Sequence, residues 1–106
     1  IEMGTPGSIL NRIMVVEDEP SICEICQHVL TGAGFEVDIA ENGKVAQAMI
    51  VEKRYDMCLI DIRMPEVNGK ELYQWLQEKY PQMANKVMFT TRAMMIAHIR
   101  QLSSSE

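Results

Sequence analysis

Two short apolar segments, each ending at acidic residues, most constrain how this chain can fold. Residues 13–16 read IMVV and lead directly into three acids at positions 17–19, and residues 57–60 read MCLI and lead into Asp61. An apolar run without polar alternation is typical of a strand buried on both faces. We therefore expect two central strands of a parallel sheet, each carrying carboxylates at its carboxyl end.

The rest of the chain alternates between strand and helix patterns. Residues 35–40 alternate between apolar and acidic side chains, and residues 86–91 read KVMFTT, with β-branched and aromatic residues, so both are predicted strands. Apolar residues recur at helical spacing between and after the strands, in residues 22–30, 45–50, 72–80 and, more weakly, 95–102. This order predicts an α/β domain: a parallel sheet of order 2-1-3-4 with flanking helices.

Composition narrows the class of protein. The 106 residues suit one domain, and the net charge of −5 argues against nucleic-acid or membrane-surface partners, which need a basic face. No apolar run approaches a membrane span and no signal peptide is visible. We expect a cytoplasmic protein with a flexible leader at residues 1–8, a domain at 9–102 and a frayed tail at 103–106.

The three cysteines fit a reducing compartment better than a disulfide framework, because their number is odd. Cys23 and Cys26 have the spacing of a metal or redox pair. They lie inside a helical pattern, however, and no second cysteine pair completes a zinc site. We interpret them as small apolar helix residues.

The carboxylates are predicted to meet, because ligand sites of such sheets lie beyond the carboxyl ends of the strands. Glu17, Asp18 and Asp61 would then repel one another and titrate as a group. A hard divalent cation such as Mg²⁺, with Mn²⁺ as an alternative, removes that repulsion and prefers oxygen ligands. One of the carboxylates could then attack phosphorus and form an aspartyl phosphate.

Three segments of the chain resemble a known family. They read IMVVEDEP, MCLIDIRMPEVNG and VMFTT, and together they make residues 9 to about 91 similar to the response-regulator receiver domain of two-component signalling. The resemblance implies a flavodoxin-like fold, Mg²⁺ binding, and phosphoryl transfer to an aspartate from a phosphohistidine. The implied partner is a histidine kinase or a phosphotransfer domain.

The resemblance also implies a role for each matching residue. Asp61 corresponds to the phosphoacceptor, Asp18 to the direct metal ligand, and Glu17 to an acid that acts through metal-bound water. Arg63 would offer its backbone carbonyl to the metal. Thr91 corresponds to the switch hydroxyl.

The chain departs from the family pattern after the fourth strand. The family carries a fifth strand ending in a Lys-Pro pair and a fifth helix, and we expect this chain to lack both, so that its domain is C-terminally incomplete. Arg92 stands where the family pattern has a small residue, and it could either obstruct the site or replace the missing lysine charge. The apolar strand at residues 87–90 would form an open edge, which predicts a homodimer.

Two functions follow from these features. The first is a phosphoaccepting receiver domain, which is not an enzyme beyond self-catalysed phosphorylation and dephosphorylation. The alternative is an inert receiver-like interaction module that has lost phospho-switching. An aspartyl phosphatase is disfavoured because Arg63 stands where such enzymes carry a second acid. A flavin-binding flavodoxin is disfavoured because no Ser/Thr/Gly-rich loop follows the first strand.

Overall fold

The four predicted strands form one parallel sheet in the order β2-β1-β3-β4. The strands span Arg12–Val16 (β1), Glu36–Ala40 (β2), Met57–Asp61 (β3) and Val87–Thr90 (β4). The computed structural model describes residues 12–62 and 69–103. The predicted leader, the segment that contains Arg63 and Pro65, and residues 104–106 lie outside the described residues. The predicted α/β class and strand order are confirmed.

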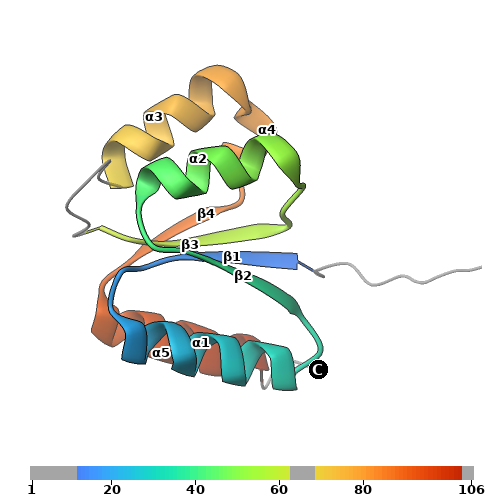
Figure 1. Cartoon of the computed structure of the whole chain (residues 1–106), viewed down its shortest axis with the longest axis vertical. Coiled ribbons are helices and arrows are strands. Elements are labelled where there is room, and N and C mark those ends of the chain that lie inside the picture. Colours follow the sequence, from blue (N-terminus) through green and yellow to red (C-terminus); the bar gives the residue numbers. More distant parts are fainter. Residues whose placement is uncertain (1–11, 63–68, 104–106) are drawn as a thin grey trace, which may run out of the picture.

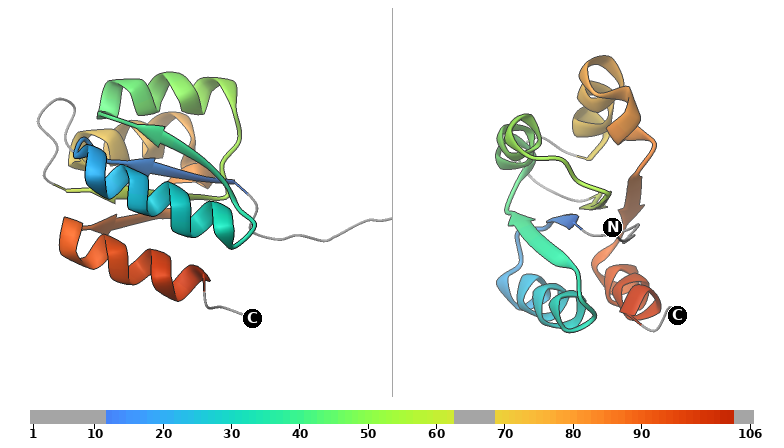
Figure 2. Two further views of the ribbon diagram at one scale, coloured as in Figure 1. Left: turned by 60° about the horizontal axis from the view of Figure 1, so that its bottom comes forward. Right: turned by 90° about the vertical axis from the view of Figure 1, so that its right-hand side faces the viewer.

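Helices cover both faces of the sheet (Figure 1). They span Pro20–Gly32 (α1), Gly43–Glu52 (α2), Gly69–Lys79 (α3), Pro81–Ala84 (α4) and Arg92–Ser103 (α5). Helices α2, α3 and α4 lie on one face, and α1 and α5 lie side by side on the other (Figures 1 and 2). No helix in residues 12–62 or 69–103 is long and apolar enough to cross a membrane.

The strand sequences explain why the sheet needs two helical layers. Residues Ile13 and Val15 of β1 are buried in the core beneath α1 and α5, whereas Met14 and Val16 are buried in the core beneath α2, α3 and α4. Successive side chains of a strand point to opposite faces. A fully buried apolar side chain stabilises the fold by about 1.5 to 3 kcal/mol, so each helical layer covers a substantial apolar surface.

Local signals set most of the helix ends. The side chain of Asn42 accepts a 2.9 Å hydrogen bond from the backbone N–H of Val45 and thereby caps α2, as its position before the helix predicts. α3 ends at Lys79, because the residue before Pro81 avoids helical geometry. Pro81 also begins α4, because proline is well suited to the first position of a helix. This single turn is not among the helices predicted from the sequence.

The last helix is better packed than its sequence pattern suggests. Met95 and Ile99 are fully buried between α5, α1 and the sheet. The helix follows β4 without a loop, since β4 ends at Thr90 and α5 begins at Arg92. This short connection places the first turn of α5 at the carboxyl end of the sheet.

Candidate functional site

Three carboxylates meet at the carboxyl ends of β1 and β3. Oxygen atoms of Glu17, Asp18 and Asp61 all lie within 4.8 Å of one another. Glu17 and Asp18 follow β1 directly, and Asp61 is the last residue of the adjacent strand β3. The sheet register therefore brings together the three acids that the sequence predicted to meet.

Glu17 is fully buried, which is unusual for an acid. Its Oε2 accepts hydrogen bonds from the backbone N–H groups of Asp18 (3.0 Å) and Glu19 (2.8 Å), just before α1. Burial raises the pKa of Glu17. A hydrogen bond from Arg92 lowers this pKa and offsets part of the rise, whereas the neighbouring Asp61 raises the pKa further. Burial and the neighbouring carboxylate therefore disfavour the ionised form of Glu17, and a bound cation would favour it.

Arg92 extends its guanidinium into the acidic cluster. Its Nε lies 2.8 Å from Oε2 of Glu17 and 3.6 Å from Oδ2 of Asp61, and its Nη2 lies 2.6 Å from Oδ1 of Asp18. The hydrogen bond to Glu17 is the main reason that the pKa of Arg92 rises above its ordinary value. The sequence left open whether this residue obstructs the site or supplies charge, and the structure shows it bonded to the acids.

The two threonines at the end of β4 differ in their surroundings. Thr90 is buried, pairs with Asp61 in the sheet register, and donates a 3.0 Å hydrogen bond to the Thr91 carbonyl oxygen. Thr91 is partly exposed, and its hydroxyl accepts a 3.3 Å hydrogen bond from the backbone N–H of Met94 in the first turn of α5. The assignment of Thr91 as switch hydroxyl remains a prediction.

The donor atoms of the cluster suit a hard divalent cation. All three side chains offer carboxylate oxygen, the ligand type that Mg²⁺ and Mn²⁺ prefer. Oε1 of Glu17 is buried and accepts no hydrogen bond from any residue that the structure describes. A buried carboxylate oxygen is costly unless it is paired. The residues present therefore fit a metal ion, while Arg63 lies outside the described residues.

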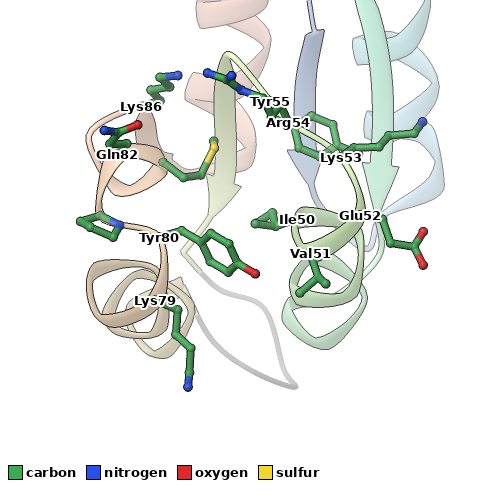
Figure 3. Close-up of a pocket in the computed structure, with 12 residues that line it drawn as sticks. Ile50, Val51, Glu52, Lys53, Arg54, Tyr55, Lys79, Tyr80, Gln82 and Lys86 are labelled. Carbon is green, nitrogen blue, oxygen red and sulfur yellow. The ribbon is translucent and has the colours of Figure 1, made fainter.

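A hollow with a volume of about 600 Å³ lies at the opposite end of the sheet (Figure 3). It is lined by residues 50–55 at the end of α2 and by residues 79–83 and Lys86. These segments precede β3 and β4, so the hollow faces the amino ends of these strands. None of the three clustered acids lines it, and it is separate from the candidate site.

The chain folds into a parallel α/β domain with a cluster of three acids at the carboxyl ends of its central strands. The family model described as "Response regulator receiver domain" matches residues 13–105. The chain belongs to this family, as the sequence motifs predicted.

Curated relatives match this chain over part of their own, longer chains. The chain is 36% identical over 77 residues to the transcriptional regulatory protein CusR of Escherichia coli K12, covering 73% of this chain and 32% of CusR. It is 32% identical over 71 residues to the response regulator protein PilR of Pseudomonas aeruginosa, covering 67% of this chain and 16% of PilR. The chain thus spans about a third or less of the length of these relatives.

Solved structures share the fold. The response regulator TrrA of Thermotoga maritima, in complex with Mg²⁺ and BeF, is 33% identical with a TM-score of 0.66; the match covers 77% of this chain and 68% of that one. TrrA in complex with the histidine kinase ThkA is 35% identical with a TM-score of 0.70, covering 77% and 69%.

Proposed function

We propose that this chain is a phosphoacceptor domain that takes a phosphoryl group onto Asp61 from the phosphohistidine of a histidine kinase or a phosphotransfer domain. The observation that carries the proposal is the meeting of Glu17, Asp18 and Asp61 within 4.8 Å at the end of β1 and β3. The similarity to TrrA, solved both with Mg²⁺ and BeF and with a histidine kinase, supports it. The working compartment would be the cytoplasm.

The reaction needs a nucleophile and a positive charge that stabilises the phosphoryl oxygens, and both must be held in a defined position. An oxygen of the Asp61 carboxylate forms a bond to phosphorus while the phosphorus–nitrogen bond to the donor imidazole breaks, and the imidazole leaves with the bonding electron pair. Asp18 and Asp61 would hold the divalent cation directly, Glu17 would act through metal-bound water, and the Arg63 carbonyl would add a ligand. Bound Mg²⁺, or Mn²⁺, would supply positive charge to the transferring phosphoryl oxygens.

Other residues would position the phosphoryl group. We assign the Thr91 hydroxyl as a donor to an equatorial phosphoryl oxygen, a role that uses its O–H, while its oxygen accepts the hydrogen bond from the Met94 N–H. No other catalytic activity is assigned to the chain. The domain would occupy residues 9–102, with a homodimer formed through the β4 edge.

Phosphorylation by a small donor tests this function. Acetyl phosphate with Mg²⁺ should add one phosphoryl group, seen by intact mass, and the adduct should be labile to hydroxylamine. Asp61→Asn should abolish the adduct. Asp56→Asn is the control and should keep the adduct. Asp56 lies just before β3, at the opposite end of the strands, where its Oδ2 accepts a hydrogen bond from the backbone N–H of Arg12.

Two results would contradict the proposal. An adduct that survives in Asp61→Asn would place the phosphoryl group on another residue. A folded chain that takes no phosphoryl group from acetyl phosphate or from a phosphohistidine donor would support the alternative function, an inert receiver-like interaction module.

A further inference from the structure

Arg92 shares its hydrogen-bond acceptors with the cation that the site is built to hold. Its Nη2 donates to Oδ1 of Asp18 at 2.6 Å, and its Nε lies 3.6 Å from Oδ2 of Asp61. Asp18 and Asp61 are the two side chains assigned to direct metal coordination. A guanidinium has no acceptor atom, so it cannot join a coordination shell and can only compete for the same oxygens.

The packing of α5 fixes the position of Arg92. Met95 and Ile99 are fully buried, so the helix cannot rotate about its axis without exposing them. The backbone N–H of Met95 also donates a 2.8 Å hydrogen bond to the Thr91 carbonyl oxygen, which continues the helix directly from the strand end. The Arg92 side chain, in the first turn, is therefore held beside the acids.

The contacts of Arg92 differ in how readily a cation can replace them. The Glu17 carboxylate is fully buried and its Oε2 also accepts two backbone hydrogen bonds. The Asp18 side chain is 33% exposed and that of Arg92 is 46% exposed. Water and ions therefore reach the Arg92–Asp18 pair, whereas the pair with Glu17 is sheltered on the carboxylate side.

We propose that Arg92 is a built-in cation that competes with Mg²⁺ for Asp18 and Asp61 and so determines the metal affinity of the domain. The proposal rests on the proposed function, because it takes Mg²⁺ as the ion of that site. Metal binding requires the guanidinium to give up Asp18, while its bond to Glu17 can persist. The positive charge of Arg92 further disfavours a second cation nearby.

Metal titration of matched variants tests the competition. Mg²⁺ binding is measured by calorimetry and by amide NMR shifts for the native chain, Arg92→Ala, Arg92→Lys and Arg100→Ala. Arg92→Ala should bind Mg²⁺ roughly twofold to fivefold more tightly, in line with one partly exposed ion pair. Arg92→Lys, which keeps the charge but loses the forked donor, should lie between. Arg100→Ala, in the last turn of α5, should match the native chain.

A second measurement needs no variant. The Nη–H resonances of Arg92 should shift in the native chain as Mg²⁺ saturates the site, because the Nη2 group gives up its hydrogen bond to Asp18. If circular dichroism shows that Arg92→Ala is unfolded, the Mg²⁺ affinity of Arg92→Lys and the Arg92 Nη–H resonances of the native chain test the proposal instead. An affinity in folded Arg92→Ala equal to or weaker than the native one would overturn the proposal, and so would unchanged Nη–H resonances at saturation.

The outcomes separate this inference from the proposed function. Suppose that the native chain binds Mg²⁺ and is phosphorylated on Asp61, but Arg92→Ala binds Mg²⁺ with the same affinity. This result would overturn the competition and leave the proposed function standing. Absence of Mg²⁺ binding from both the native chain and Arg92→Ala would overturn the competition and the metal site together.

Discussion

The hydroxyl of Tyr55 lies 2.6 Å from Oδ2 of Asp38 and donates a hydrogen bond to it. Tyr55 lies between α2 and β3, so the bond ties this connection to β2; Lys53 donates to the same oxygen at 3.1 Å. Burial alone would raise the pKa of Asp38, but the bonds from Tyr55 and Lys53 outweigh it and hold the pKa below its ordinary value of 3.8. The folded state therefore prefers the ionised carboxylate.

This pair predicts a pH-dependent effect of Tyr55→Phe. At neutral pH the variant should lose about 1.5 to 3 kcal/mol of unfolding free energy, the range for a hydrogen bond to a charged group. A lowered acid pKa stabilises the fold fully above the unfolded-state pKa, and this contribution is lost as pH falls through the folded-state pKa. The difference from the native chain should thus shrink below pH 3.8.

Urea unfolding at pH 7 and at about pH 3 measures that difference. Tyr80→Phe, which removes a hydroxyl outside this pair, is the control and should show no such pH dependence. An equal loss of stability at both pH values in Tyr55→Phe would mean that the Asp38 carboxylate is not the relevant acceptor.

The cysteines should differ in reactivity. Cys26 and Cys58 are fully buried, and burial raises the pKa of each thiol to about 12. Cys23 is partly exposed, with its thiol donating a 3.3 Å hydrogen bond to the Glu17 carbonyl oxygen. Because the thiolate is the reactive form, iodoacetamide at neutral pH should modify Cys23 first and reach the other two only after unfolding.

Mass spectrometry of adducts over time, with and without urea, follows this order. Cys23→Ser should remove the first adduct and leave the two that need unfolding. Native modification of Cys58 ahead of Cys23 would contradict the described packing of β3.

Metal binding should depend on Asp18 and not on Glu19. Asp18→Ala removes one of two carboxylates assigned to direct coordination, so its Mg²⁺ affinity should fall at least about tenfold. Glu19→Ala is a matched control, because it removes an adjacent acid that is not part of the cluster. Calorimetry of both variants checks this, and a native affinity in Asp18→Ala would refute the assignment.

The sequence predicted the parts of the site that depend on strand ends. Apolar runs that end at Glu17 and Asp61 are local signals, and parallel pairing then places both acids at the same edge. The short helix α4 was missed because Pro81 ends one helix and begins another, and the sequence shows both as a single break. The contacts of Arg92 depend on how α5 packs against α1, which is a nonlocal property that no short motif encodes.

The strand β4 forms one edge of the sheet. Within the part of the chain that the structure describes, β4 pairs with β3 alone. Its carbonyls at Lys86 and Thr90 accept hydrogen bonds from Cys58 and Ile62 of the β3 side. Since backbone groups alternate in direction along a strand, those of Val87 and Phe89 point outward. Such an edge is a template for strand addition.

A substitution at Phe89 should therefore control self-association. Phe89 is 38% exposed and packs edge-on against Tyr73, with ring centroids 5.5 Å apart. Phe89→Pro removes the outward N–H and blocks strand addition without breaking the β3 ladder, whereas Phe89→Ala loses the same ring but keeps the N–H. Light scattering across a concentration series should show dimers for the native chain, weaker dimers for Phe89→Ala, and monomers for Phe89→Pro. A native chain that stays monomeric at high concentration, or equal association of the two variants, would rule out pairing through this edge.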